Sequence, residues 1–205
     1  MTLRSKAVAV LPSLLFAGLA VLAADAPPGA AAGDLSVDEA YDHHSHHRHT
    51  ELDPGAGFSR QEAVFLERLF RLIDLAIVEK TRAWIWFQSE GRKGAPVSRY
   101  RDRIDALLGE LDRLPAPERL REVKSLIAQA IEDQRAHFEA WDRAVREVGS
   151  GTGEPGGEPA GGGIFMRRSS QKLHQAYDRL RALFPAAGPR NLDAFYDHLC
   201  VLDLL

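Results

Sequence analysis

The chain has 205 residues, of which 45% are hydrophobic and 27% charged, and its formal net charge is −3. This composition excludes a wholly disordered chain, a fibrous repeat and a multi-span membrane protein. The single cysteine excludes an intramolecular disulfide and a cysteine-rich zinc module, and the slightly acidic balance gives no reason to expect a nucleic-acid partner.

Residues 1–24 have the pattern of a signal peptide. Arg4 and Lys6 are the only charged residues before Asp25, and the run from residue 7 to residue 24 is apolar and ends in small residues. This order is typical of a secretory signal. An uncleaved membrane anchor is the alternative, for which the run is marginal in length. We expect an exported protein, periplasmic or secreted, with no transmembrane span after cleavage.

Residues 25–57 are rich in Ala, Gly, Pro and Asp and show no helical or strand period, which predicts a disordered N-terminal tail. Five histidines within it form a candidate metal site: His43, His44, His46, His47 and His49. Neutral imidazole is a good ligand for Zn, Cu and Ni, so one of these ions is the cofactor to test. The alternative is a solvated tail whose histidines titrate near pH 6.5.

From Phe58 onward, apolar residues recur at helical spacing, which predicts an all-α fold. Ser59 and Glu62 match a capping box at the start of the first helix. That helix is apolar on most sides, Val64 and Leu75 included, and is expected to pack centrally. Helices are predicted over residues 59–88, 98–114 and 117–148, within a three-helix core of residues 58–148.

Residues 149–163 are rich in Gly and contain two prolines, which predicts a flexible linker. Ser169 or Ser170 is expected to cap a fourth helix, and Asn191 a fifth. Residues 164–205 would then form a helical hairpin that packs on the core. The predicted fold is an antiparallel helical bundle of about five helices, two long and three short.

An aromatic and basic segment is a candidate recognition surface, made of Trp84, Trp86, Arg92, Lys93, Arg99, Arg101 and Arg103. Trp84 and Trp86 are about 200° apart on a helix, so both cannot face one core layer. One of them is expected to meet the fourth or fifth predicted helix, a cavity or a partner. The basic side chains suit phosphates, anionic lipid heads or an acidic partner, and the alternative is an ordinary solvated face.

His198 and Cys200 are candidate functional residues of the core. Two residues apart on a helix, they point about 200° away from each other and do not converge on one metal ion or form a nucleophile pair. Cys200 is expected to be a buried apolar thiol. His198 is either a satisfied core residue or a functional one.

These observations favour a non-enzymatic binding or interaction protein of the cell envelope, with an unknown protein or small-molecule ligand. No pair of acid–base groups converges by sequence spacing. A periplasmic metal-binding protein that uses the histidine-rich tail is the alternative. A second alternative is an enzyme whose site is assembled across helices.

Overall fold

A computed structural model describes residues 35–45, 50–55, 57–89, 97–149 and 162–204. The predicted signal peptide, most of the glycine-rich linker and the residues His46, His47, His49, Arg92 and Lys93 lie outside the described residues. The helices are α1 (Val37–His43), α2 (Arg60–Ser89), α3 (Val97–Arg113), η1 (Glu118–Leu120), α4 (Arg121–Gly149), α5 (Gly162–Leu183) and α6 (Gly188–Asp203). No strand occurs in this part of the chain, which confirms the all-α class.

The three helices of residues 60–149 begin and end close to their predicted limits. At the start of α2, the Ser59 amide donates to the Glu62 carboxylate at 2.9 Å, and the Glu62 amide donates to Ser59 Oγ at 3.3 Å. This reciprocal pair is the predicted capping box. Pro117 precedes the 3₁₀ turn η1, which leads directly into α4.

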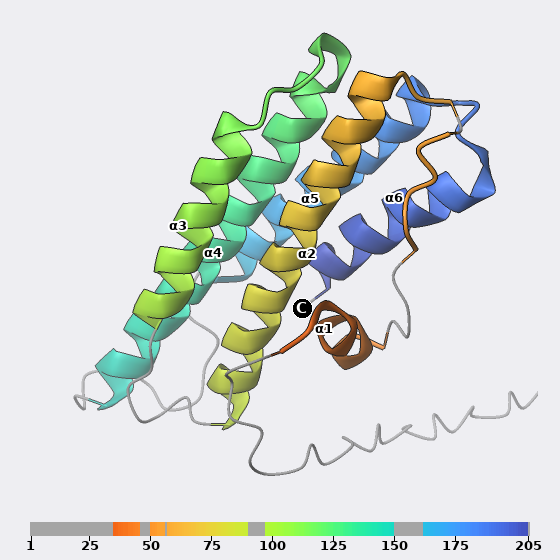
Figure 1. Ribbon diagram of the computed structural model, residues 1–205. Coiled ribbons are helices and arrows are strands. Elements are labelled where there is room, and N and C mark those ends of the chain that lie inside the picture. The colour runs from red at the N-terminus through yellow and green to blue at the C-terminus, as the bar shows by residue number, and fades with distance from the viewer. Residues whose placement is uncertain (1–34, 46–49, 56, 90–96, 150–161, 205) are drawn as a thin grey trace, which may run out of the picture. The chain divides into compact units, whose positions relative to one another are not determined.

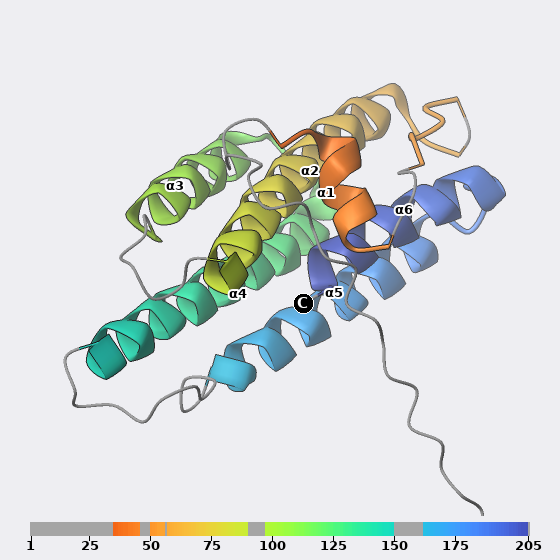
Figure 2. The same ribbon diagram turned by 90° about the horizontal axis from the view of Figure 1, so that it is seen from below.

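Helices that follow one another along the chain pack side by side from α2 to α6, and α6 also packs on α2 (Figures 1 and 2). Their apolar faces enclose one core. The largest of its fully buried aromatic and aliphatic side chains include Leu66, Leu69, Ile73, Ile77, Phe138, Phe184 and Phe195. None of the described helices has the length and apolar character needed to cross a membrane.

Two predicted helix caps are wrong because both helices begin earlier. Ser169 and Ser170 lie inside α5, where Ser169 is buried and accepts a hydrogen bond from Gln134 Nε2 at 3.1 Å. Asn191 lies inside α6, whose first turn contains Pro189. Proline is tolerated there because the first helical amides have no partner within the helix.

The expected disorder of residues 25–57 is wrong for residues 35–45. Ser36 caps α1 through a second capping box with Glu39, and Ala40 and Tyr41 of α1 are fully buried. This short helix packs on α2 beside the C-terminal end of α6 (Figures 1 and 2). Its burial, rather than any long periodic pattern, explains why it is ordered.

Residues 50–55, which we call the strap, are held on α6 by hydrogen bonds. The Thr50 amide donates to Asp197 Oδ2 at 3.0 Å, and Arg190 Nε donates to the Glu51 carbonyl at 3.2 Å. These contacts join residues that are 147 and 139 positions apart in the chain. The strap is therefore a second ordered part of the predicted tail.

Candidate recognition surface

The N-terminal half of α2 presents an outward face that we call the α2 face, formed by Arg60, Val64, Arg68, Arg71 and Leu75. Steps of three and four residues place these side chains on one side of the helix. Val64 is 42% exposed and Leu75 46%. They are two of the four large apolar side chains that are exposed among the described residues. The prediction that α2 packs on most sides is therefore wrong at these two positions.

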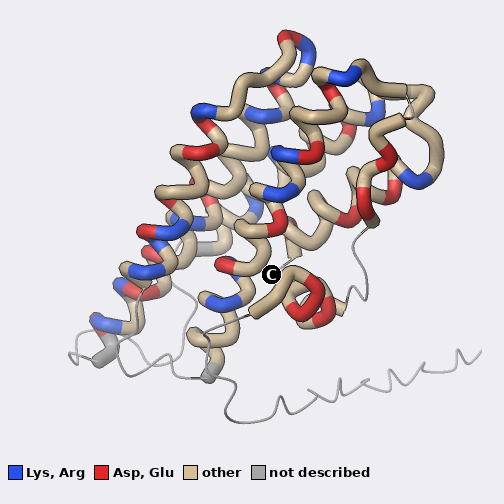
Figure 3. The backbone as a smooth tube through the Cα atoms, in the orientation of Figure 1, with Lys and Arg blue, Asp and Glu red and all other residues tan. Residues whose placement is uncertain are grey.

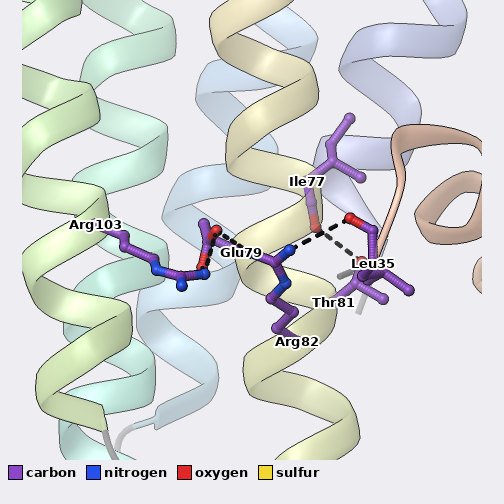
Figure 4. A network of polar contacts seen from close by, with 6 residues as sticks. All are labelled: Leu35, Ile77, Glu79, Thr81, Arg82 and Arg103. Atoms are coloured by element: carbon purple, nitrogen blue, oxygen red, sulfur yellow. Dashed lines mark hydrogen bonds and ion pairs between the residues drawn. The ribbon is translucent and has the colours of Figure 1, made fainter. Parts of the chain in front are cut away.

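The three arginines of the α2 face make no hydrogen bond or ion pair within the described part of the chain. Glu67, which borders them, is exposed as well. Further along α2 an arginine is paired: Arg82 binds Glu79, which also binds Arg103 of α3, as Figure 4 shows. The α2 face therefore presents guanidinium groups that are available to an outside partner.

An open groove of about 410 Å³ lies beside the α2 face. The groove is lined by Arg60, Gln61, Val64, Phe65, Arg68, Leu114 and Pro115. Lys124 of α4 fixes its far wall, because Lys124 Nζ donates to the carbonyls of Asp112 and Leu114 at 2.7 Å each. A cation at the end of α3 also suits the negative end of the helix dipole.

The aromatic residues of the predicted recognition surface pack within the bundle. Trp84 lies edge-on to Trp141 of α4, with ring centroids 5.7 Å apart, so it meets the third predicted helix and not the fourth or fifth. The ring centroids of Trp86 and Phe87 are 4.6 Å apart, and Phe87 is a buried residue that also stacks on Trp141.

The described arginines of the same surface lie on α3. Arg99, Arg101 and Arg103 are all exposed, and Arg103 also binds Glu79 of α2. Positively charged positions also recur along α2, outside the predicted surface (Figure 3). The predicted surface did not include the arginines of the α2 face, although they lie at helical spacing in the sequence.

His198 belongs to a buried polar cluster that joins α1, α2 and α6. The Tyr41 hydroxyl donates to Asp74 Oδ1 at 2.9 Å, and His198 Nε2 lies 3.4 Å from the same oxygen. His198 Nδ1 donates to the Ala194 carbonyl at 2.7 Å, and its ring stacks on Phe70. Burial, reinforced by the charge of Asp74, raises the pKa of Tyr41. The cluster fastens α1 to the bundle.

Lys80 is a fully buried cation that the sequence predictions missed. Its ammonium group donates to the carbonyls of Val201, Leu202 and Leu204 at 2.7–2.8 Å, at the C-terminal end of α6. Burial lowers the pKa of Lys80 to about 7, and the nearby Asp203 acts in the opposite direction. A signal was present, because Lys80 follows Leu69, Ile73 and Ile77 on the buried side of α2.

Cys200 is partly exposed, so the prediction of a buried thiol is wrong. It lies near the surface of α6 beside Tyr196, which is 51% exposed. A hydrogen bond between the Tyr196 hydroxyl and Cys200 raises the pKa of Tyr196. The position of Cys200 at the edge of the core explains its partial exposure.

Two of the five tail histidines are described. His43 ends α1, and His44 Nε2 lies 3.0 Å from Thr81 Oγ1. Because the Thr81 hydroxyl donates to the Ile77 carbonyl, His44 is the donor in this contact. Among the described residues, no group of three or more His, Cys, Asp or Glu side chains is placed to hold a metal ion.

Comparisons of the chain with protein-family models, curated proteins and solved structures found no match. The candidate function therefore depends on the α2 face and its groove. Apolar side chains beside a groove, together with arginine, are typical of protein-binding sites.

Proposed function

We propose that the protein is an exported, non-enzymatic interaction protein of the cell envelope that binds a partner protein through the α2 face. The signal-like sequence of residues 1–24 supports export. The observation that carries the binding proposal is that Val64 and Leu75 share one side of α2 with three arginines that have no hydrogen-bond or ion-pair partner among the described residues. Val64 lines the groove, and Leu75 lies about three turns further along the same side of α2.

The α2 face is preformed, which favours binding. On the opposite side of the same helix, Leu66, Leu69 and Ile73 are fully buried in the core. The backbone that carries the exposed side chains is therefore already ordered before a partner arrives. Binding then costs mainly the ordering of the arginine and leucine side chains.

Photo-cross-linking with the full chain, in the cells that produce it, tests this proposal. A benzophenone amino acid replaces Gln61 or Leu75 on α2, and Gln175, an exposed residue of α5, is the matched control position. We expect a protein adduct from the two α2 positions and none from position 175. The same adduct pattern at all three positions, or a lack of protein adducts from α2, would contradict the proposal.

Metal binding by the histidine-rich segment is a second candidate function. The observation that favours it is that the described residues on either side of positions 46–49 are attached to the domain, His44 to Thr81 and Thr50 to Asp197. Attachment at both ends reduces the conformational entropy that chelation must remove. Calorimetric titration with Ni²⁺, Cu²⁺ and Zn²⁺ should show binding that is lost when all five histidines are replaced by Ser. Binding that is unchanged by this replacement would exclude the segment as the site.

A further inference from the structure

Building on the proposed function, we infer that the partner is a protein that presents an acidic segment. One large apolar side chain of this segment enters the groove beside α2, and flanking carboxylates pair with Arg60, Arg68 and Arg71. The groove supports this inference, and so, separately, do the three arginines that have no partner in the described part of the chain.

The groove provides the apolar part of the site. Val64 and Phe65, which belong to α2, lie opposite Leu114 and Pro115 at the end of α3. The groove between them has a volume of about 410 Å³. Phe65 and Leu114 are almost fully buried, so the floor of the groove is rigid, whereas Val64 at its rim is exposed. A concave apolar site of this kind favours a single anchor side chain, the usual centre of a protein-binding hot spot.

The charges provide the polar part of the site. Arg60 and Arg68 line the groove itself, and Arg71 lies about one turn further along α2. The planar guanidinium group pairs with a carboxylate through two parallel hydrogen bonds, so arginine favours Asp and Glu. From Arg60 to Arg71 the helix rises about 16 Å, a length that about three turns of a helical partner segment can match.

A second copy of this chain fits the α2 face poorly. In a two-fold symmetric dimer the same patch meets itself, which would bring arginines toward arginines. A lipid surface also fits poorly, because helices that lie in a membrane interface bury a broad apolar face. The α2 face has two exposed aliphatic side chains and a concave apolar site beside them.

The first test is the composition of the cross-linked segment. Peptide mapping of the adduct from position 61 should identify a partner segment with a large apolar residue and at least two Asp or Glu residues within a turn on either side. A neutral or basic segment would overturn this inference and leave the proposed function standing. An adduct with lipid instead of protein would overturn both.

The second test is a charge exchange in vitro. The identified segment is made as a labelled peptide, and its affinity for the full-length protein is measured by fluorescence anisotropy. Arg68→Glu with Arg71→Glu should weaken binding by at least about tenfold, because like charges then face each other. Arg143→Glu with Arg167→Glu, two exposed positions on α4 and α5, is the control and should change affinity by less than about twofold.

Changing two acidic residues of the peptide to Lys should restore binding to the Arg68→Glu, Arg71→Glu variant. Circular dichroism melting verifies that both double variants fold, which is expected because all four arginines are exposed. Equal weakening by the two double variants, or a lack of rescue by the Lys peptide, would overturn the inference. Binding to phosphatidylglycerol vesicles is measured for the same variants. If Arg68→Glu with Arg71→Glu abolishes vesicle binding but leaves peptide binding unchanged, the partner is a lipid surface and the inference is overturned.

Discussion

Asn191 of α6 holds Asp53 of the strap through both ends of its side-chain amide. Asn191 Oδ1 accepts a hydrogen bond from the Asp53 amide at 2.7 Å, and Asn191 Nδ2 donates to the Asp53 carbonyl at 3.1 Å. The same Nδ2 donates to the Ala187 carbonyl at 2.9 Å, and the side chain is fully buried. One buried amide therefore fixes the strap to α6.

Asn191→Ala should release the strap. The substitution leaves the Asp53 amide and carbonyl without these partners, so we expect the free energy of unfolding to fall by about 2 kcal/mol. Limited proteolysis should also cut the strap faster in this variant. Arg190→Ala, which removes an exposed hydrogen bond from the same turn, should have a smaller effect. Equal effects of the two substitutions in chemical denaturation would contradict the role assigned to Asn191.

Tyr41→Phe should destabilise the attachment of α1. The change keeps the buried ring but removes the hydroxyl that donates to Asp74, so we expect a loss of about 1 kcal/mol in urea denaturation. Tyr177→Phe, a partly exposed position on α5, is the matched control and should be nearly neutral. If Tyr41→Phe were as stable as the control, the hydroxyl contact would not hold α1 in place.

Lys80 should make stability depend on pH above neutrality. Its pKa is lowered from 10.5 to about 7 in the folded protein, so between these values the unfolded chain holds a proton that the folded protein has released. The unfolded state binds more protons, and the free energy of unfolding therefore rises with pH in this window, by up to about 1.4 kcal/mol per pH unit.

The measurement is the difference in unfolding free energy between the natural protein and Lys80→Met at several pH values from 6.5 to 10. This comparison cancels the contribution of the other titrating groups. The variant also loses the hydrogen bonds to the α6 carbonyls, which shifts its stability by a constant amount. Parallel pH profiles for the two proteins would show that Lys80 keeps its proton throughout the window.

The contact between His44 and Thr81 should contribute to stability, whereas the other four histidines of the tail should affect only metal binding. Replacing His43, His46, His47 and His49 by Ser should reduce binding of Ni²⁺ or Cu²⁺ with little change in melting temperature. Adding His44→Ser removes the hydrogen bond to Thr81 and should lower the melting temperature by about 2–4 °C. A melting temperature that is the same with and without His44→Ser would show that the contact adds nothing to stability.

The sequence predicted the long helices because their apolar periodicity extends over many turns. It also predicted the Ser59–Glu62 capping box, which is a local pattern. Ser36 and Glu39 have the same spacing and form the same capping box, so the start of α1 could have been found. The helix was missed because seven residues are too few for a periodic signal, and its order depends on burial of Tyr41 against α2.

Side-chain roles that depend on distant segments were harder to predict. Ser169 and Asn191 resemble helix caps locally, but each bonds with a partner on another segment. Lys80 could be placed on the buried side of α2 by spacing, whereas its carbonyl partners on α6 could not. Similarly, the sequence places the apolar residues Val64 and Leu75 on a helix that is expected to pack centrally. Only the packing shows that no other described helix covers them.

The central claim is that the α2 face binds an acidic partner protein through its arginines, and the most direct measurement is the yield of the protein adduct from position 61 in cells. We expect Arg68→Glu with Arg71→Glu to abolish this adduct, while the matched Arg143→Glu with Arg167→Glu leaves its yield unchanged. An adduct that forms equally in both double variants, at equal protein levels, would contradict the claim.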